Sequence, residues 1–467
     1  MRLKFWGAAR TVTGSMHLIE LDNGKKVLLE CGLYQGSGGF KDEYNRSFPC
    51  PPSEIDLMVL SHAHIDHCGN IPQLVRAGFR GNIYCTHATY DLASIMLQDS
   101  AKIQEMDAKH INKRRRKKGL EPIEPYYTTR DVQPALKLFH ALPYGLWTKL
   151  SDEVQLMFLD AGHMLGSASV SLRIQEGGKT TRIGFTGDIG RYDQMILRDP
   201  QPMPQCDYLI SESTYGGKVH EAQGDTKELL FQIMQETCVK RGGKLIIPAF
   251  SVGRTQNLVH TLDQLENEGR LPRTDVYVDS PLAVNATQIF ETHPECYDED
   301  LLEYLHKDKN PFGFNRLRYV RDTQESKDLN DKPGPYVVIS SSGMMTAGRI
   351  LHHLAHGLED ERNTILVVGY CADGTLGSKI VNGAEEVRIH GDSYKVRAEV
   401  KRLNGFSGHG GQNEMLEFIQ AGQDRRALKK IFLVHGEGDR SERFQNYLIA
   451  NGYPHVVVPH RGESFKL

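Results

Sequence analysis

The stretch LSHAHIDHCGN, residues 60–70, places three histidines and one aspartate within the six positions from His62 to His67. It continues the apolar run DLMVL, residues 56–60, which predicts a buried β-strand. Successive side chains of a strand point to opposite faces, so His62 and His64 should point the same way if that geometry persists. Asp66 and His67 follow beyond a predicted bend. Zinc prefers imidazole nitrogens and carboxylate oxygens, so the stretch predicts metal ligands at a strand end.

Three other segments place a candidate ligand in the same context, just past an apolar strand. They are His163 in LDAGHMLGS, Asp188 in GFTGDIG and His435 in FLVHGEG. Functional groups gather at strand ends because the strands form a rigid scaffold. Each of these histidines taken alone could be an ordinary hydrogen-bonded residue. Taken together, the strand ends favour a site for two metal ions.

Length and composition limit the possible classes of protein. A chain of 467 residues is too long for one ordinary core, which predicts two domains or one domain with a large insertion. Hydrophobic residues make up 39% and charged residues 25%, as in globular proteins. No apolar run approaches the roughly 18 residues of a membrane span, and no signal peptide is evident. We therefore predict a cytoplasmic protein that does not enter a membrane.

The charge of the chain is nearly balanced, with a formal net value of -3. A polyanionic substrate would therefore have to be held by local patches or bound cations. One basic run stands out, KRRRKK at residues 113–118. Because charge runs usually face water, this run predicts a solvated helix end. The eight cysteines include no CxxC pair, which argues against a disulfide framework or a zinc ribbon.

The distribution of strands and helices changes along the chain and predicts an inserted domain of the α/β class. The first part contains short strands with glycine-rich turns, which indicate an antiparallel or mixed sheet. Residues 209–384 alternate buried strands such as KLIIPAF and PYVVISSSG with helical segments, which predicts a parallel sheet. Strands return after residue 385. We therefore predict one domain from residues 1–208 and 385–467, interrupted by a second domain at residues 209–384.

Six motifs carry a resemblance to a known family. HAHIDH, AGHMLGSA, TGD, ESTYGG, FSGHGG and LVHGEG occur in this order and resemble the metallo-β-lactamase superfamily, specifically its β-CASP branch of nucleic-acid-processing nucleases. Within that branch, the chain is most similar to the RNA-cleaving group that includes the nuclease subunit of the cleavage and polyadenylation specificity factor. The resemblance implies a metallo-β-lactamase αββα sandwich with an inserted parallel α/β β-CASP domain.

The resemblance also implies a ligand set and catalytic roles. One zinc ion would be held by His62, His64 and His163, a second by Asp66, His67 and His435, and Asp188 would bridge the two. Two such ions can hold a bridging hydroxide in line with a phosphorus atom and neutralise the charge that develops. The family's general acid corresponds to His409 in GFSGHGG, with Glu212 of SESTYGG as its carboxylate partner. Asp66, Asp188, Glu212 and His409 are thus the implied catalytic residues.

Glu30 in LLECGLYQG departs from the family pattern. Relatives usually carry aspartate at this position, where the carboxylate supports the metal-binding histidines. Glutamate can make the same contacts with one more methylene, so the chemistry should be preserved while the geometry changes.

Three strand-loop-helix segments are candidates for substrate binding. They are PAFSVGRTQ, ISSSGMMTAGR and DGTLGSK. Small residues in such loops expose backbone N–H groups and helix N-termini to phosphate, and basic side chains can add charge. The alternative is that serine and glycine merely form tight turns there. The candidate residues are Ser251, Arg254, Ser341, Arg349 and Lys379.

The predicted function is a zinc-dependent RNA nuclease that hydrolyses single-stranded RNA, mainly as an endonuclease and with exonucleolytic trimming as a further mode. One alternative is a DNA-repair nuclease of the same fold, although DNA-directed relatives tend to carry valine at the position of His409. The other is a non-catalytic RNA-processing scaffold subunit, although such members lose metal ligands and this chain keeps all seven. The sequence does not determine the oligomeric state.

Overall fold

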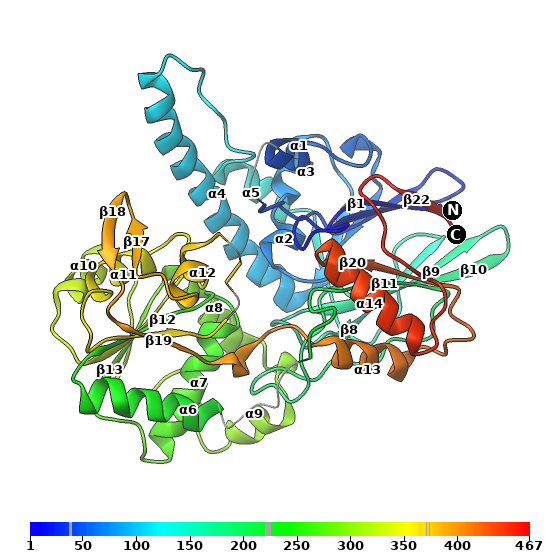
Figure 1. Cartoon of the computed structure of the whole chain (residues 1–467). Coiled ribbons are helices and arrows are strands. Elements are labelled where there is room, and N and C mark those ends of the chain that lie inside the picture. Colours follow the sequence, from blue (N-terminus) through cyan, green and yellow to red (C-terminus); the bar gives the residue numbers. More distant parts are fainter. Residues whose placement is uncertain (37–39, 220–225, 370, 373) are drawn as a thin grey trace. The chain divides into compact units, whose positions relative to one another are not determined.

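The computed structural model describes residues 1–36, 40–219, 226–369, 371–372 and 374–467, and the chain divides into two compact units (Figure 1). The first unit contains residues 1–219 and 409–467, and the second contains residues 220–408. Among the described residues, no helix combines the length and the apolar composition needed to cross a lipid bilayer.

Two mixed sheets form the centre of the first unit. One has the order β22-β1-β2-β3-β4-β5-β6, antiparallel from β22 to β3 and parallel from β3 to β6. Its strands are β1 (Arg2–Gly7), β2 (Met16–Glu20), β3 (Lys26–Leu29), β4 (Leu57–Val59), β5 (Asn82–Thr86), β6 (Phe139–Leu142) and β22 (Ser464–Lys466). This arrangement confirms the mixed sheet predicted for the first part of the chain.

The second sheet repeats this mixture in the order β21-β20-β11-β10-β9-β8-β7. It is antiparallel from β7 to β10 and parallel from β10 to β21. Its strands are β7 (Thr148–Lys149), β8 (Val154–Asp160), β9 (Ala168–Glu176), β10 (Lys179–Phe185), β11 (Tyr208–Glu212), β20 (Lys430–Val434) and β21 (Val456–Val457).

Apolar side chains fill the space between the two sheets and beneath the helices on their outer faces. Phe5 of β1, Phe158 of β8 and Phe432 of β20 pack in the central core. The neighbouring residue of β20, Leu433, packs on the opposite face against α14, as expected for a strand buried on both sides. The helices are α1 (Phe40–Arg46), α2 (Ile65–Cys68), α3 (Ile71–Arg76), α4 (His87–Lys117), α5 (Thr129–Leu136), α13 (Gln412–Gly422) and α14 (Gly438–Ala450), with a 3-10 turn at Pro52–Glu54. The layers form the predicted αββα sandwich.

A parallel sheet organises the second unit, in the order β14-β13-β15-β12-β16-β19. Its strands are β12 (Lys244–Pro248), β13 (Asp275–Asp279), β14 (Leu317–Tyr319), β15 (Tyr336–Ser340), β16 (Thr364–Val367) and β19 (Glu399–Arg402), and β17 (Glu386–Ile389) and β18 (Asp392–Lys395) form a separate hairpin. The helices are α6 (Thr226–Met234), α7 (Arg254–Asn267), α8 (Pro281–Thr292), α9 (Glu299–Tyr304), α10 (Thr323–Asp331), α11 (Ile350–Gly357) and α12 (Leu376–Val381), with a π-helical turn at Gln235–Lys240 and 3-10 turns at Pro294–Cys296 and Asn404–Phe406. This is the parallel α/β domain that the sequence predicts.

Both boundaries of the inserted unit lie later in the chain than the sequence pattern predicts. The predicted boundary at residue 209 falls within β11, which pairs with β10 and β20 in the first unit. The predicted return at residue 385 precedes β19, which pairs with β16 in the second unit. The sequence pattern of a strand does not reveal its pairing partner, so the pattern alone does not locate either edge of the inserted unit.

Candidate metal centre and acid–base pair

The seven predicted ligands all lie on segments that follow strands of the first unit. His62 and His64 follow β4, and Asp66 and His67 lie in the short helix α2. His163 follows β8, Asp188 follows β10 and His435 follows β20. Although β4 ends at Val59, the rings of His62 and His64 still reach the same group of side chains. The fold therefore gathers residues that are up to 373 positions apart in sequence, from His62 to His435.

The ligand atoms form two adjacent groups. His62, His64, His163 and Asp188 place one ligand atom each within 4.8 Å of one another, and so do Asp66, His67 and His435. The carboxylate of Asp188 lies between them: Oδ2 is 3.5 Å from His62 Nε2 and 3.4 Å from His67 Nε2. Its other oxygen, Oδ1, is 3.4 Å from His435 Nδ1. Asp188 is thus in reach of residues from both groups, as a bridging ligand must be.

Hydrogen bonds at the outer ring nitrogens orient three of the histidines. Ser61 donates its hydroxyl to Glu30 Oε2 at 3.0 Å, so His62 Nδ1–H donates to Ser61 Oγ at 2.9 Å. His67 Nδ1 donates to Glu30 Oε2 at 2.6 Å. Thr214 donates its hydroxyl to the carbonyl of His435, so His435 Nδ1–H donates to Thr214 Oγ1 at 3.0 Å. In each ring the network assigns the proton to Nδ1 and directs Nε2 towards the centre, as for a metal-binding histidine.

The spacing of the inner nitrogens fits a metal ion. Zinc–nitrogen bonds of 2.0–2.1 Å at tetrahedral angles hold two ligand nitrogens about 3.3 Å apart. Nε2 of His67 and Nε2 of His435 are 3.0 Å apart, and His163 Nε2 is 3.1 Å from His64 Nδ1. Nε2 of His62 is buried and makes no hydrogen bond to a described residue. Lone pairs that approach this closely need a proton or a cation between them.

The charge of the site also favours cations. Glu30, Asp66, Asp188 and Glu212 contribute four carboxylates, and none of them pairs with a lysine or arginine of the described chain. Burial alone would raise the pKa of Asp188, but His435, His67 and His62 hold this pKa well below its ordinary value. Burial lowers the pKa of His64 to about 4, which leaves that imidazole neutral. His64 and Asp188 are therefore in the forms that bind a metal ion, a neutral imidazole and an ionised carboxylate.

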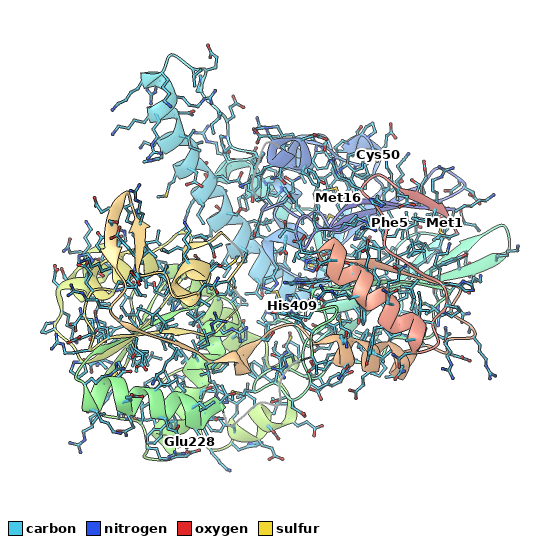
Figure 2. The ribbon with its side chains drawn as sticks, in the orientation of Figure 1. Met1, Phe5, Met16, Cys50, Glu228 and His409 are labelled. Carbon is cyan, nitrogen blue, oxygen red and sulfur yellow. The ribbon has the colours of Figure 1, made fainter. Side chains whose placement is uncertain are left out.

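A second functional pair, His409 and Glu212, lies against the ligand cluster. Glu212 ends β11 and accepts a hydrogen bond from the backbone N–H of Ile189 at 2.5 Å. Its Oε2 is 3.3 Å from His409 Nδ1, and the His409 ring lies 4.4 Å from the ring of His163. Burial lowers the pKa of His409, but Glu212 and Asp188 outweigh burial and raise this pKa to about 9. Figure 2 labels His409, whose side chain remains 22% exposed and therefore within reach of a substrate.

Glu30 contacts the ligand His67 at Nδ1, the ring nitrogen that faces away from the centre of the cluster, as expected from its place in the sequence. Besides accepting from His67, it accepts the backbone N–H of Ser61 at 2.6 Å, and its own backbone has a φ of 63°. The left-handed conformation of a buried non-glycine residue indicates a position held by its surroundings. Nearby Gly32 is required because a Cβ atom would lie 1.6 Å from the carbonyl oxygen of Asp66. Ser61 and Thr214 were not predicted, although each adjoins a quoted motif or lies within one.

Replacing Glu30 with glutamine should weaken metal binding without unfolding the protein. The amide can accept from His67 or from Ser61, but its NH2 group would face the remaining donor. We expect a metal dissociation constant about 10–100-fold higher, the usual cost of losing an outer partner of a ligand. Competition with a chromophoric chelator measures this constant, and Glu30→Asp, which keeps the charge, should lose less. Equal affinities for wild type and Glu30→Gln would exclude the supporting role.

The five predicted substrate-binding residues all belong to the second unit. Ser251 and Ser341 each contact the hydroxyl of Ser280, at 3.1 and 2.9 Å, where β12, β13 and β15 end. Arg254 begins α7, and exposed Lys379 lies in α12. The guanidinium of Arg349 is bound to buried Asp279 at 2.6 Å and to the carbonyl of Arg321 at 2.8 Å. Asp279 also binds His353, in a buried network that the sequence did not indicate.

The fold and the site together define a metal-dependent hydrolase with the metallo-β-lactamase architecture. Family models match residues 9–232 (metallo-beta-lactamase superfamily), 255–380 (Beta-Casp domain) and 393–459 (Zn-dependent metallo-hydrolase RNA specificity domain). The chain belongs to the β-CASP branch of the metallo-β-lactamase superfamily.

Two curated relatives show how far this similarity extends. The chain is 38% identical over 440 residues to Ribonuclease TTHA0252 of Thermus thermophilus, covering 94% of each chain. It is 32% identical over 450 residues to Transcription termination factor FttA of Methanocaldococcus jannaschii, covering 94% of this chain and 67% of that protein.

Proposed function

We propose that the protein is a zinc-dependent ribonuclease that hydrolyses phosphodiester bonds of single-stranded RNA, as an endonuclease with exonucleolytic trimming as a further mode. The observation that carries this proposal is the His409–Glu212 pair beside a seven-residue ligand cluster, with His409 Nδ1 3.3 Å from Glu212. The name of the ribonuclease relative and the match to an RNA specificity domain support RNA as the substrate.

The donor set favours zinc over magnesium or calcium. Five imidazoles and two carboxylates form the cluster, whereas the harder cations prefer oxygen ligands almost exclusively. His62, His64 and His163 would hold one ion, Asp66, His67 and His435 the other, and Asp188 both. When bound, such a pair of ions lowers the pKa of a water molecule and neutralises charge on the phosphoryl oxygens.

The remaining chemistry belongs to side chains of the protein. The Asp66 side chain is 20% exposed, so this carboxylate can also accept a hydrogen bond from the attacking water. The contact of Glu212 with Nδ1 of His409 orients the ring and directs Nε2 away from Glu212. A proton at Nε2 can then pass to the leaving oxygen of the RNA, which is the role of a general acid. Glu212 stabilises the charged ring before that transfer.

We further propose that the second unit binds the RNA backbone through Ser251, Ser341, Arg254 and Lys379, while Arg349 orders the loop that carries Ser341. The guanidinium of Arg349 is bound to Asp279, so this side chain positions the loop and adds little free positive charge for RNA. The cytoplasmic location stays a prediction of the sequence.

Cleavage of RNA and DNA strands of identical sequence tests the proposed substrate. Zinc-loaded protein should cut end-labelled single-stranded RNA at internal positions and leave the DNA strand intact, because the site is proposed to act on RNA. Gel analysis of the product ends distinguishes internal cuts from trimming. Cleavage of the DNA strand at an equal or higher rate would favour the DNA-repair alternative, and cleavage of neither strand would favour the scaffold.

A further inference from the structure

The C-terminal half of α4 and the segment that returns from it form a projecting arm, residues 102–127. The buried residues of α4 cluster before this point: of its residues after Ala101, only Ala108 is buried. Figure 1 shows this half of the helix and the following loop extending beyond the sheets and other helices of the first unit. Tyr126 and Tyr127, where the returning segment rejoins the unit, pack in the apolar core, but the rest of the arm adds almost nothing to that core. The projecting part therefore requires another explanation.

The arm is an ordered element held by hydrogen bonds between its two limbs. Asn112 donates to the carbonyl of Ile123 at 2.9 Å and accepts the N–H of Ile123 at 2.7 Å. Arg115 Nε donates to the carbonyl of Glu121 at 2.5 Å, and Gln104 accepts the N–H of Tyr126 at 3.1 Å. The returning limb therefore braces the C-terminal half of the helix, in which only Ala108 is buried and tertiary packing adds little stability.

Positive charge is concentrated at the far end of the arm. Residues 102–118 contain eight lysines and arginines but only two acidic residues, in a chain whose net charge is -3. In the run at residues 113–118, all side chains except Arg115 are exposed, and none forms an ion pair with a described residue. Pairs such as Lys113–Lys117 and Arg114–Lys118 repel one another at helical spacing. Cations in the last turn complement the helix dipole, but that effect needs only one or two of them.

The same helix begins at the metal centre. Thr86 and Thr89, at the start of α4, donate their hydroxyls to the carbonyl of Gly166 at 2.6 and 2.8 Å. Gly166 belongs to the loop that carries His163. At 1.5 Å per residue, the 31 residues of α4 place its basic end roughly 45 Å from this loop. The helix therefore joins the metal centre to a distant cationic surface within one unit.

We propose that this arm binds the phosphate backbone of RNA at a distance from the metal centre, so that long RNA is bound more tightly than short RNA. The inference builds on the proposed ribonuclease function and adds a second contact with the substrate. A strand with about 3.4 Å per nucleotide needs on the order of 13 nucleotides to cover the length of α4. RNA of about 5 nucleotides can occupy the metal centre without reaching the arm, whereas RNA of about 30 nucleotides can reach both.

A charge-removal variant tests the proposal. This variant carries glutamine, a good helix former, in place of four cations of the arm: Lys113, Arg114, Lys117 and Lys118. Arg115 is left unchanged because it makes a structural contact. The matched control replaces four other exposed cations of the first unit with glutamine: Arg2, Lys179, Arg426 and Lys466. A second arm variant, Lys113→Arg with Lys117→Arg and Lys118→Arg, keeps the charge. Circular dichroism confirms that all three remain folded.

The expected result is specific to the arm and to long RNA. With zinc-loaded enzyme, the arm variant should show a KM for 30-nucleotide RNA that is about 10-fold higher or more, with an unchanged kcat. For 5-nucleotide RNA, both KM and kcat should equal the wild-type values. Fluorescence anisotropy in a His409→Ala background measures binding without rapid cleavage. Because each lost contact with a single strand lowers the salt slope by about 0.7, the slope should fall by up to about 3. The control and the arginine variant should match wild type.

Three outcomes distinguish failure of this inference from failure of the proposed function. If the arm variant and the control have the same affinity and salt slope for long RNA, the arm does not bind RNA. If the arm variant keeps its RNA affinity but loses binding to vesicles containing phosphatidylserine, the surface serves membranes and the proposal is overturned. If the wild type binds long RNA through the arm but cleaves no RNA, the RNA-binding role of the arm is retained and the proposed ribonuclease function is rejected.

Discussion

Replacement of Asp188 with alanine is expected to remove both metal and activity. The two oxygens of Asp188 reach residues of both ligand groups, at 3.4–3.5 Å from His62, His67 and His435. Without it, five imidazoles converge in a buried site with less negative charge to balance two cations. Wild-type protein purified without chelator should contain close to two zinc ions per chain, and the variant one or fewer. Because metal ions contribute several kcal/mol and each 1.36 kcal/mol is tenfold in rate, cleavage should fall roughly 10⁴-fold or more.

A neighbouring buried aspartate provides the matched control for this experiment. Asp160 ends β8, three residues before His163, and accepts the N–H of Gly162 at 2.9 Å. Burial raises the pKa of Asp160 to about 7, so part of this carboxyl is protonated and uncharged near neutral pH. The neutral amide of Asp160→Asn resembles that protonated form. This variant should keep its metal and its activity. A wild-type content of one zinc ion or fewer, after zinc has been resupplied, would exclude the dinuclear site.

His409→Ala is expected to separate proton delivery from metal binding. His409 contacts Glu212 and the ring of His163 but is not one of the seven ligands, so zinc content should remain near the wild-type value. Cleavage should fall by roughly two to four orders of magnitude, the usual contribution of a positioned general acid. Glu212→Gln should lose a smaller part of the rate, because the ring keeps its proton donor but loses a charged partner. His455→Ala, at an exposed histidine, is the control and should behave as wild type.

The identity of the leaving group makes this experiment decisive for the role of His409. Sulfur departs without being protonated, so RNA with a 3' bridging sulfur at the scissile bond does not need the acid. The His409→Ala variant should therefore cleave the sulfur-bridged RNA at a rate close to that of wild type. An equal defect on sulfur-bridged and ordinary RNA would show that His409 acts in some other way and that the proposed mechanism is wrong.

The sequence predicted the layers of the fold well because its signals were local. Alternating and continuous apolar runs mark strands wherever they occur. The αββα sandwich and the parallel sheet of the second unit followed from the order of these runs and from the resemblance. The ligand residues were recognisable for a similar reason: HAHIDH brings four polar groups into six positions, and other motifs each place one residue directly after a strand.

Other features could not be read from the chain because they depend on distant partners. β19 looked like part of the returning domain, but its hydrogen bonds go to β16. Arg349 was predicted to face phosphate, but its guanidinium is bound by Asp279, seventy positions earlier in the chain. Thr214 holds the ring of His435 across more than two hundred residues. The basic run was predicted to be a solvated helix end, and only the structure shows that this end projects from the unit.

The sequence by itself therefore determined which side chains could bind metal and what kind of elements carry them, because residue type and local periodicity are properties of neighbouring positions. Only the tertiary structure decided how these side chains meet: Asp188 between the two groups, Glu30 behind His67, and His409 against His163. Strand pairing and burial set these contacts. They are selected by the packing of the whole unit, in which each sheet combines strands that come before the inserted unit with strands that follow it.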